Sequence, residues 1–185
     1  MFYYWTFSKI IPYIVSIVGG IFLSYLLSKS TSKIRIIRFF IWLIPLVIYF
    51  IFNPVYEDDF SNNYREIHLK KELVSSNENQ LIVITIPNCL FCFESIKTIK
   101  EIKKRVPTLN VKYIVCSKDS SSIDLYKKEI DGSFQISNCQ NPKEWGGICQ
   151  GKFPSYLLIA NKSNRIWSND NFGTFVKDEI EEIFD

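Results

Sequence analysis

The chain has 185 residues, of which 47% are hydrophobic and 22% are charged, so it has room for one ordinary domain and a small appendage. Its net charge of +3 hides two different parts. Residues 1–56 hold five basic residues and no acidic one, whereas residues 57–185 hold 17 basic and 19 acidic residues. Because no basic face or nucleic-acid motif accompanies the positive charge, the composition argues against nucleic-acid binding.

The first part has the composition of membrane-crossing helices. Residues 10–27 form a run of 18 residues without a charge, preceded by four residues, Phe2-Tyr3-Tyr4-Trp5, that suit a headgroup region. The second apolar run, residues 39–52, would make a helix of about 21 Å, shorter than a bilayer core of about 30 Å. This second helix spans the bilayer core if Ile36 and Ile37 join it and the flanking arginines extend toward the headgroups. We therefore predict a transmembrane hairpin in residues 1–56, with helices at about 8–28 and 36–53.

A cleaved signal peptide is the alternative for the first run, but the amino terminus lacks the usual basic region and no small-residue cleavage site follows. The loop between the two runs carries Lys29, Lys33, Arg35 and Arg38, which the positive-inside rule assigns to the cytoplasm. The rest of the chain then lies outside. We expect a two-pass protein of a bacterial inner membrane whose C-terminal domain is in the periplasm, where disulfides persist.

The second part reads as alternating strands and helices. Residues 57–80 are polar and form a linker with one first element, either a short helix or an edge strand. The elements expected after it are a buried strand (81–86), a helix (89–105), a buried strand (111–115), a helix (120–130), an irregular stretch (131–152), a hairpin (156–160 and 165–167) and a final helix (175–184). The first strand, helix and strand imply a parallel pair joined by a right-handed crossover, in a domain that covers residues 81–185.

The motif Cys89-Leu90-Phe91-Cys92 follows the first strand directly and opens the helix. A redox dithiol occupies that place in such folds, because the amino end of a helix stabilises a thiolate through its free N–H groups and its dipole. We expect Cys89, with Asn88 as a possible cap, to attack substrate disulfides. Cys92, one turn deeper, then resolves the mixed disulfide. Leu90 and Phe91 are expected to form an apolar rim that binds an extended protein substrate.

These features resemble the thioredoxin-like superfamily, particularly the membrane-anchored thiol-disulfide oxidoreductases of bacterial envelopes. The strand that leads into Cys89-x-x-Cys92, Phe153-Pro154 directly before a strand, and the terminal strand, strand and helix carry the resemblance. It implies an α/β domain with a central mixed sheet flanked by helices. It also implies that Pro154 is cis and lies beside the dithiol, where the backbone next to it, at Phe153, pairs with an extended substrate.

Three positions depart from that family. Asn88 stands where a tryptophan is common, Leu90-Phe91 is neither of the dipeptides familiar between the cysteines, and Val83 replaces a buried acid. These differences leave the direction of disulfide exchange open.

The other three cysteines allow several interpretations. Cys139 and Cys149 lie in the least regular segment, and we expect them to form a structural disulfide there. Cys116 ends the strand 111–115, at the sheet edge where the dithiol is expected. It is either an auxiliary thiol that relays with Cys89 or Cys92, or a buried free cysteine.

The function predicted from the sequence is a membrane-tethered, extracytoplasmic thiol-disulfide oxidoreductase, whose partners are protein thiols and disulfides, the membrane and possible subunits of a membrane complex. The alternative is a non-catalytic thioredoxin-like subunit or scaffold in which Cys89–Cys92 is an inert disulfide. No cofactor is expected, since the sequence carries no nucleotide, haem or flavin motif. No metal site is expected either, because His68 lacks companions and there is no second CxxC or histidine pair.

Overall fold

The computed structural model describes residues 5–28, 43–52, 62–69, 79–117, 119, 121–139, 141–160 and 163–184. These residues divide into two compact units, Met1–Phe60 and Ser61–Asp185. The first unit contains helices, and the second contains a sheet flanked by helices.

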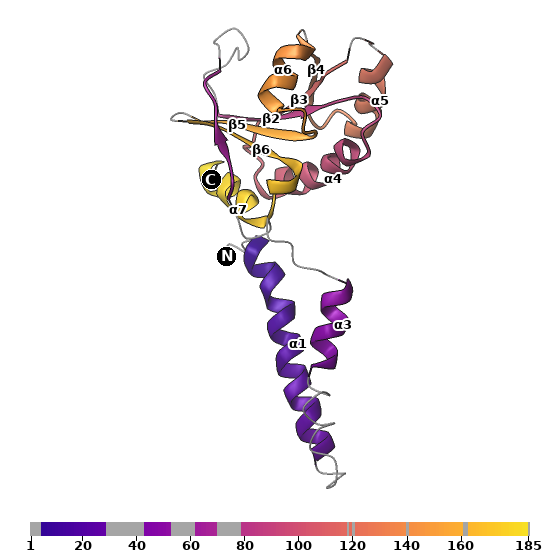
Figure 1. Cartoon of the computed structure of the whole chain (residues 1–185), viewed down its shortest axis with the longest axis vertical. Coiled ribbons are helices and arrows are strands. Elements are labelled where there is room, and N and C mark those ends of the chain that lie inside the picture. Colours follow the sequence, from indigo (N-terminus) through magenta and orange to yellow (C-terminus); the bar gives the residue numbers. More distant parts are fainter. Residues whose placement is uncertain are drawn as a thin grey trace. The chain divides into compact units, whose positions relative to one another are not determined.

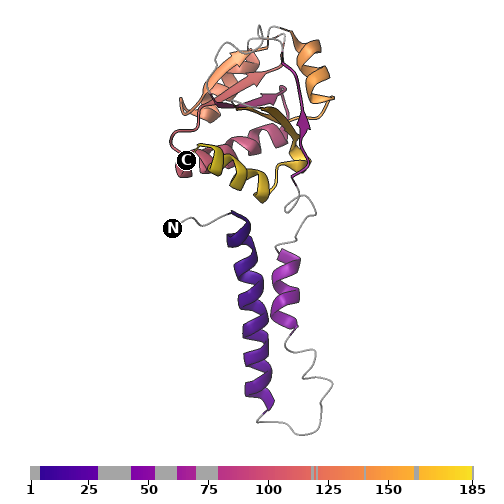
Figure 2. The same cartoon turned by 90° about the vertical axis from the view of Figure 1, so that its left-hand side faces the viewer.

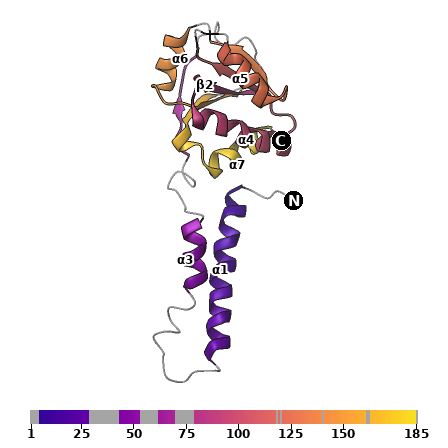
Figure 3. The ribbon, with the colours of Figure 1, turned by 90° about the vertical axis from the view of Figure 1, so that its right-hand side faces the viewer.

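Two apolar helices, α1 (Trp5–Ser28) and α3 (Ile44–Phe52), make up the described part of the first unit. They run side by side in opposite directions (Figure 2 and Figure 3), and the rings of Tyr13 and Tyr49 meet edge to face with centroids 4.8 Å apart. The segment Trp5–Leu26 of α1 is long and apolar enough to cross a membrane. The nine residues of α3 extend about 14 Å, roughly half of a bilayer core.

The predicted hairpin of two membrane-crossing helices is therefore corrected. Among the described residues, one helix meets the requirements for crossing a membrane, and it lies near the amino terminus. The second helix, predicted at 36–53, is present as α3 from Ile44 onward, and residues 36–42 lie outside the described residues. The physical reason is length, because the described apolar helix is too short to span the hydrocarbon core.

The second unit is built on a mixed six-stranded sheet in the order β1-β6-β5-β2-β3-β4. The strands are β1 (Arg65–Glu66), β2 (Gln80–Thr85), β3 (Val111–Val115), β4 (Gln135–Asn138), β5 (Ser155–Ala160) and β6 (Ser163–Ser168). β2 pairs in parallel with β3, and β3 with β4, whereas β5, β6 and β1 continue the sheet on the other side of β2 in antiparallel fashion. Every residue of β2 is buried, as expected for a central strand that is covered on both faces.

Helices cover both faces of this sheet. They are α4 (Leu90–Arg105), α5 (Ser121–Ile130), α6 (Pro142–Cys149) and α7 (Thr174–Phe184), with a short 3-10 turn, η2 (Asn169–Asn171), before the last. Figure 1 shows α6 on one face and α4 and α7 on the opposite face. α5 lies against α4, where the rings of Tyr126 and Phe93 stack with centroids 4.6 Å apart. The mixed sheet, its strand order and its flanking helices define an α/β thioredoxin-like fold.

Most of the elements predicted for this unit are confirmed to within one or two residues. The prediction that residues 131–152 are irregular is wrong. This stretch contains β4 and α6. β4 has the sequence QISN and no buried residue, so it lacks the apolar alternation that marks a strand. α6 contains Gly146 and Gly147, which lower helix propensity. Its helical conformation is favoured by the packing of its apolar residues on the sheet, which the local sequence does not show. The first element expected in 57–80 is the edge strand β1.

One ion pair with a buried carboxylate joins α4 to α7. Arg105 and Glu181 lie 2.8 Å apart, and the side chains are 32% and 8% exposed. We expect Arg105→Met to lower the free energy of unfolding by about 1–3 kcal/mol, because the buried Glu181 carboxylate loses its ion pair with Arg105. Urea denaturation measures this loss. The double variant Arg105→Met/Glu181→Gln should recover part of it, and a double variant no more stable than the single one would contradict the explanation.

Candidate active site

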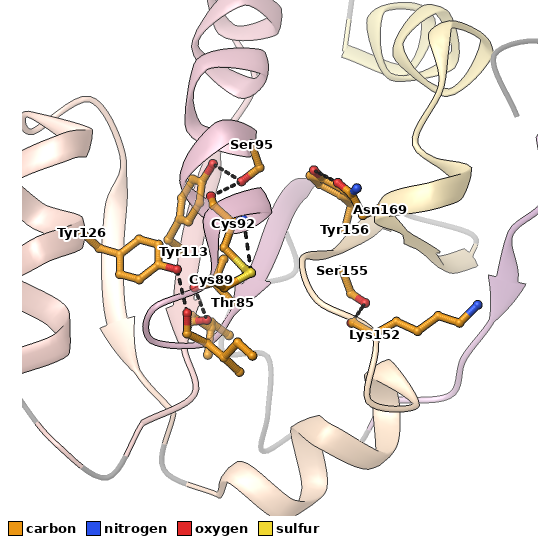
Figure 4. The surroundings of a disulfide bond; sticks show 12 residues. Thr85, Cys89, Cys92, Ser95, Tyr113, Tyr126, Lys152, Ser155, Tyr156 and Asn169 are labelled. Atoms are coloured by element: carbon orange, nitrogen blue, oxygen red, sulfur yellow. Dashed lines mark hydrogen bonds between the residues drawn. A yellow bond between two sulfur atoms is a disulfide. The ribbon is translucent and has the colours of Figure 1, made fainter. Parts of the chain in front are cut away.

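The cysteines of the CxxC motif form a disulfide at the first turn of α4, with Cα atoms 5.2 Å apart (Figure 4). β2 ends at Thr85, and the chain then turns through Asn88, whose φ of 55° lies in the left-handed region that asparagine tolerates. Cys89 follows as the N-cap of α4. The dithiol therefore lies at the carboxyl end of the parallel strands, the edge where α/β sheets bind ligands.

The sulfur of Cys89 faces the amino end of α4. The backbone N–H of Cys92 donates to Cys89 Sγ at 3.2 Å, and the N–H of Phe93 donates to the Cys89 carbonyl at 3.2 Å. When the disulfide is reduced, the same N–H and the helix dipole stabilise a thiolate at Cys89. Asn88, predicted as a possible cap, is not the cap, since it takes a positive φ one residue earlier and leaves that role to Cys89.

The two sulfurs differ in access. Cys92 is 0% exposed, whereas Cys89 is half-buried at the rim. Between them, Leu90 and Phe91 are 68% and 58% exposed, which makes an apolar patch directly beside the accessible sulfur. The arrangement provides one thiol that a partner can reach and one that only the first thiol can reach.

Hydroxyl groups lie beneath the buried cysteine. Ser95 Oγ donates to the Cys92 carbonyl at 2.6 Å and lies 3.5 Å from the hydroxyl of Tyr113 on β3 (Figure 4). Burial raises the pKa of Tyr113 far above its ordinary value, so this hydroxyl stays protonated. Val83 is fully buried at the position where the resemblance predicts an acid, and the one buried carboxyl among the described residues, Glu181, pairs with Arg105. In the described core, then, no carboxylate lies beneath Cys92 to take its proton.

Pro154 lies at the same edge of the sheet. The Phe153–Pro154 peptide bond is cis, and β5 begins at the next residue, Ser155. Ser155 pairs with Ile84 of β2, so Pro154 lies opposite Thr85, at the end of β2 that leads to the dithiol. Ser155 Oγ donates to the Lys152 carbonyl at 2.7 Å and closes the turn before the strand (Figure 4). The catalytic role of Pro154 and the substrate-binding role of Phe153 stay predictions.

The remaining cysteines are free and buried. Cys139 and Cys149 are separate thiols in the structure, so the disulfide predicted between them is not formed there. Cys116 follows β3, and its N–H donates to the Thr85 carbonyl at 2.7 Å, so Cys116 lies at the predicted edge of the sheet. Its role as an auxiliary thiol stays a prediction. Within the described residues, no three His, Cys, Asp or Glu side chains are placed to hold a metal ion, and His68 is exposed.

Tyr126 ties α5 to the turn that leads into the dithiol, because its hydroxyl donates to the Ile86 carbonyl at 2.8 Å. Burial raises its pKa from 10.0 to about 12. The folded protein holds this proton more tightly than the unfolded chain, so its contribution to stability is fully present below pH 10 and is lost as the pH rises toward about 12. We expect urea midpoints to fall more steeply over this range in the wild type than in Tyr126→Phe. Equal slopes would show that this hydroxyl is not the group responsible.

Sequence reasoning missed the hydroxyls of Ser95 and Tyr113. Ser95 is three residues after Cys92 on α4, a spacing that places it on the same helix face. Tyr113 belongs to an apolar strand, where a tyrosine looks like any core residue. Only the pairing of β2 with β3 brings it beneath the dithiol.

No protein-family model and no curated protein sequence matches the chain. Solved structures do match. A secreted disulfide oxidoreductase of Mycobacterium tuberculosis, homologous to DsbE of E. coli, is 12% identical with a TM-score of 0.45, over 58% of this chain and 81% of that chain. The thioredoxin domain of a thiol-disulfide oxidoreductase from Bacteroides vulgatus is 8% identical with a TM-score of 0.46, over 59% and 81%. A thioredoxin-like protein from Bacteroides caccae is 15% identical with a TM-score of 0.49, over 98% and 78%.

The class of this domain rests on its own features. The sheet order, the disulfide at the first turn of α4 and the cis-proline at the start of β5 together make it a thioredoxin-like domain with a CxxC pair.

Proposed function

We propose that this protein is a thiol-disulfide oxidoreductase that exchanges disulfides with other proteins through Cys89 and Cys92. The observation that carries the proposal is the asymmetry of the pair: Cys89 is reachable and accepts the N–H of Cys92, whereas Cys92 is 0% exposed. A disulfide that only staples a fold needs no such difference. An exchanging dithiol does, because the first thiol meets the substrate and the second attacks only the first.

In the reducing direction, the Cys89 thiolate attacks one sulfur of a substrate disulfide. A mixed disulfide forms and one substrate thiolate leaves. Cys92 then attacks Cys89 Sγ, restores the Cys89–Cys92 disulfide and releases the second substrate thiol, so two electrons pass to the substrate. Since the described core holds no carboxylate beneath Cys92, its proton passes to the departing thiolate. The oxidising direction is the reverse of these steps.

The reduction potential of the pair tests this proposal and gives the direction. The full-length chain in detergent is equilibrated across glutathione buffers, alkylated and mapped by mass spectrometry. A potential above about −200 mV supports an oxidant or isomerase, and one near −270 mV or below supports a reductase. If the pair stays oxidised throughout and Cys89 never labels, the protein is a non-catalytic subunit instead.

The exposed rim supports protein substrates rather than small thiols. We expect the double substitution Leu90→Ser/Phe91→Ser to weaken exchange with an unfolded protein disulfide by about tenfold, since two side chains that are 68% and 58% exposed lose their apolar contact with the partner. Exchange with oxidised glutathione should change little. Leu125→Ser serves as the control, because Leu125 is 52% exposed on α5. An equal loss for both kinds of substrate would rule out a docking role.

We further propose that α1 anchors the protein in a bacterial inner membrane and that the domain lies outside the cytoplasm. The other subunits of a membrane complex are the partners proposed there. Exposed apolar side chains along α1 support the anchor, among them Val15 at 62% and Val18 at 59%. The Cys89–Cys92 disulfide supports a domain outside the cytoplasm, where disulfides persist, whereas the basic residues that follow α1 favour the cytoplasm.

The compartment can be tested in intact cells. After mild reduction, a membrane-impermeant maleimide should label Cys89 without permeabilisation. Labelling only after permeabilisation would place the domain in the cytoplasm.

A further inference from the structure

A second group of thiols lies under α6, on the face of the sheet opposite α4. Cys116, Cys139 and Cys149 are 9%, 5% and 3% exposed and share one apolar cluster with Trp145 of α6 and Ile84 of β2. Three thiols in one cluster can form three different disulfides. The geometry of the cluster decides which pair can close.

The strand register favours Cys116 and Cys139. β3 and β4 are parallel neighbours whose last pair is Val115 with Asn138. The N–H of Cys139 donates to the Val115 carbonyl at 3.0 Å, which continues the ladder past that pair and sets Cys116 opposite Cys139. Neighbouring strands are about 4.8 Å apart, within the Cα separation of about 4.4–6.8 Å that a disulfide needs. Both side chains lie in the same cluster, and each thiol changes the pKa of the other.

Cys149 has other neighbours. Burial raises the pKa of its thiol to about 11, and Ser155 and the positive charge of Arg65 offset part of that rise. It also lines a pocket of about 230 Å³ together with Arg65, Lys152 and Ser155. Cys149 therefore has polar neighbours on β5 and β1 as well as its electrostatic contact with the other two thiols, whereas Cys116 and Cys139 are set opposite each other by the register of β3 and β4.

We propose that Cys116 and Cys139 are a second dithiol of this domain, which closes into a disulfide that joins the ends of β3 and β4. The site is separate from the Cys89–Cys92 pair and does not depend on the function proposed for it. Because Cys116 and Cys139 are only 9% and 5% exposed, a protein disulfide does not reach them, and the substrate class is a low-molecular-weight disulfide.

Burial raises the pKa of both thiols, so either of them can begin the exchange once it has lost its proton. The steps are the same in either order, and Cys139 is taken first. Its thiolate displaces one thiolate from the small disulfide and forms a mixed disulfide. Cys116 then attacks Cys139 Sγ, gives its proton to the leaving thiolate and closes the bond. Two protein thiols and one small disulfide become one protein disulfide and two small thiols.

Peptide mapping of the full-length chain in detergent tests the proposal directly. After incubation with oxidised glutathione, alkylation and trypsin digestion, the three cysteines fall on separate peptides, residues 113–118, 129–143 and 144–152, and the CxxC pair falls on residues 72–97. We expect peptide 113–118 linked to peptide 129–143, with Cys149 alkylated. A link between 129–143 and 144–152 in its place, or all three cysteines alkylated after prolonged oxidation, would overturn the proposal.

Variants separate this site from the other. Cys149→Ser should still form the Cys116–Cys139 link, whereas Cys116→Ser should lose it. The double variant Cys89→Ser/Cys92→Ser should form it with oxidised glutathione as readily as the wild type. Loss of the link in that double variant, with the fold intact by circular dichroism, would contradict a separate site. The wild-type map requires no substitution, so the test remains decisive even if Cys116→Ser does not fold.

Discussion

Replacing Cys89 with serine is expected to lower the rate of disulfide exchange at the CxxC pair by at least about 10³-fold, whereas replacing Cys92 with serine should stop turnover after the first step and accumulate a mixed disulfide at Cys89. The reason is the asymmetric geometry. Cys89 is reachable and is the N-cap of α4, and Cys92 is 0% exposed and reaches only Cys89. Reduction of a disulfide-bonded protein, followed by alkylation and gel mobility, measures the first variant. Mass spectrometry of the trapped complex measures the second.

The control for both variants is Cys149→Ser, because Cys149 lies outside the dithiol and lines the pocket beside β1. It should exchange at close to the wild-type rate. If Cys89→Ser retained the wild-type rate, Cys89 would not be the attacking thiol. If Cys92→Ser trapped no substrate, the proposed order of attack would be wrong.

The largest loss of stability is expected for Trp167→Ala. Trp167 on β6 is 1% exposed, and its indole N–H donates to Asn62 Oδ1 at 3.0 Å. Removing a buried aromatic side chain typically costs about 3–5 kcal/mol, through lost burial and the cavity left behind. The side-chain oxygen of Asn62, Oδ1, also loses its hydrogen-bond donor. Urea denaturation of the full-length chain in detergent, followed by circular dichroism, measures the shift.

Two comparisons separate packing from the hydrogen bond. Trp167→Phe keeps most of the ring volume and loses the indole donor, so we expect it to cost about 1–3 kcal/mol. Leu125→Ala, at a side chain that is 52% exposed, should change stability by less than about 0.5 kcal/mol. A Trp167→Ala variant as stable as Leu125→Ala would show that β6 contributes little to the core.

Much of the sheet is predictable because its strands carry local signals. The strand at 111–115 is predicted with its observed bounds, and β2 differs from its predicted range by one residue at each end. Both are rich in apolar and β-branched residues, a pattern that depends little on the rest of the chain. β4 and α6 carry no such pattern. They are stabilised by ladder bonds to β3 and by the burial of Trp145 and Cys149, which exist only in the folded domain.

By itself, the sequence determined that a CxxC pair stands between a buried strand and a helix, that Phe153-Pro154 precedes a strand, and that an apolar helix lies near the amino terminus. These are local patterns, set by the periodicity of side chains and by the few residues that tolerate turns. The tertiary structure decided which residues meet. It made Cys89 the cap of α4, placed Tyr113 beneath Cys92, and set Cys116 opposite Cys139 instead of joining Cys139 to Cys149. The physical reason is that strand order and register bring distant residues together, and no short stretch of sequence encodes that pairing.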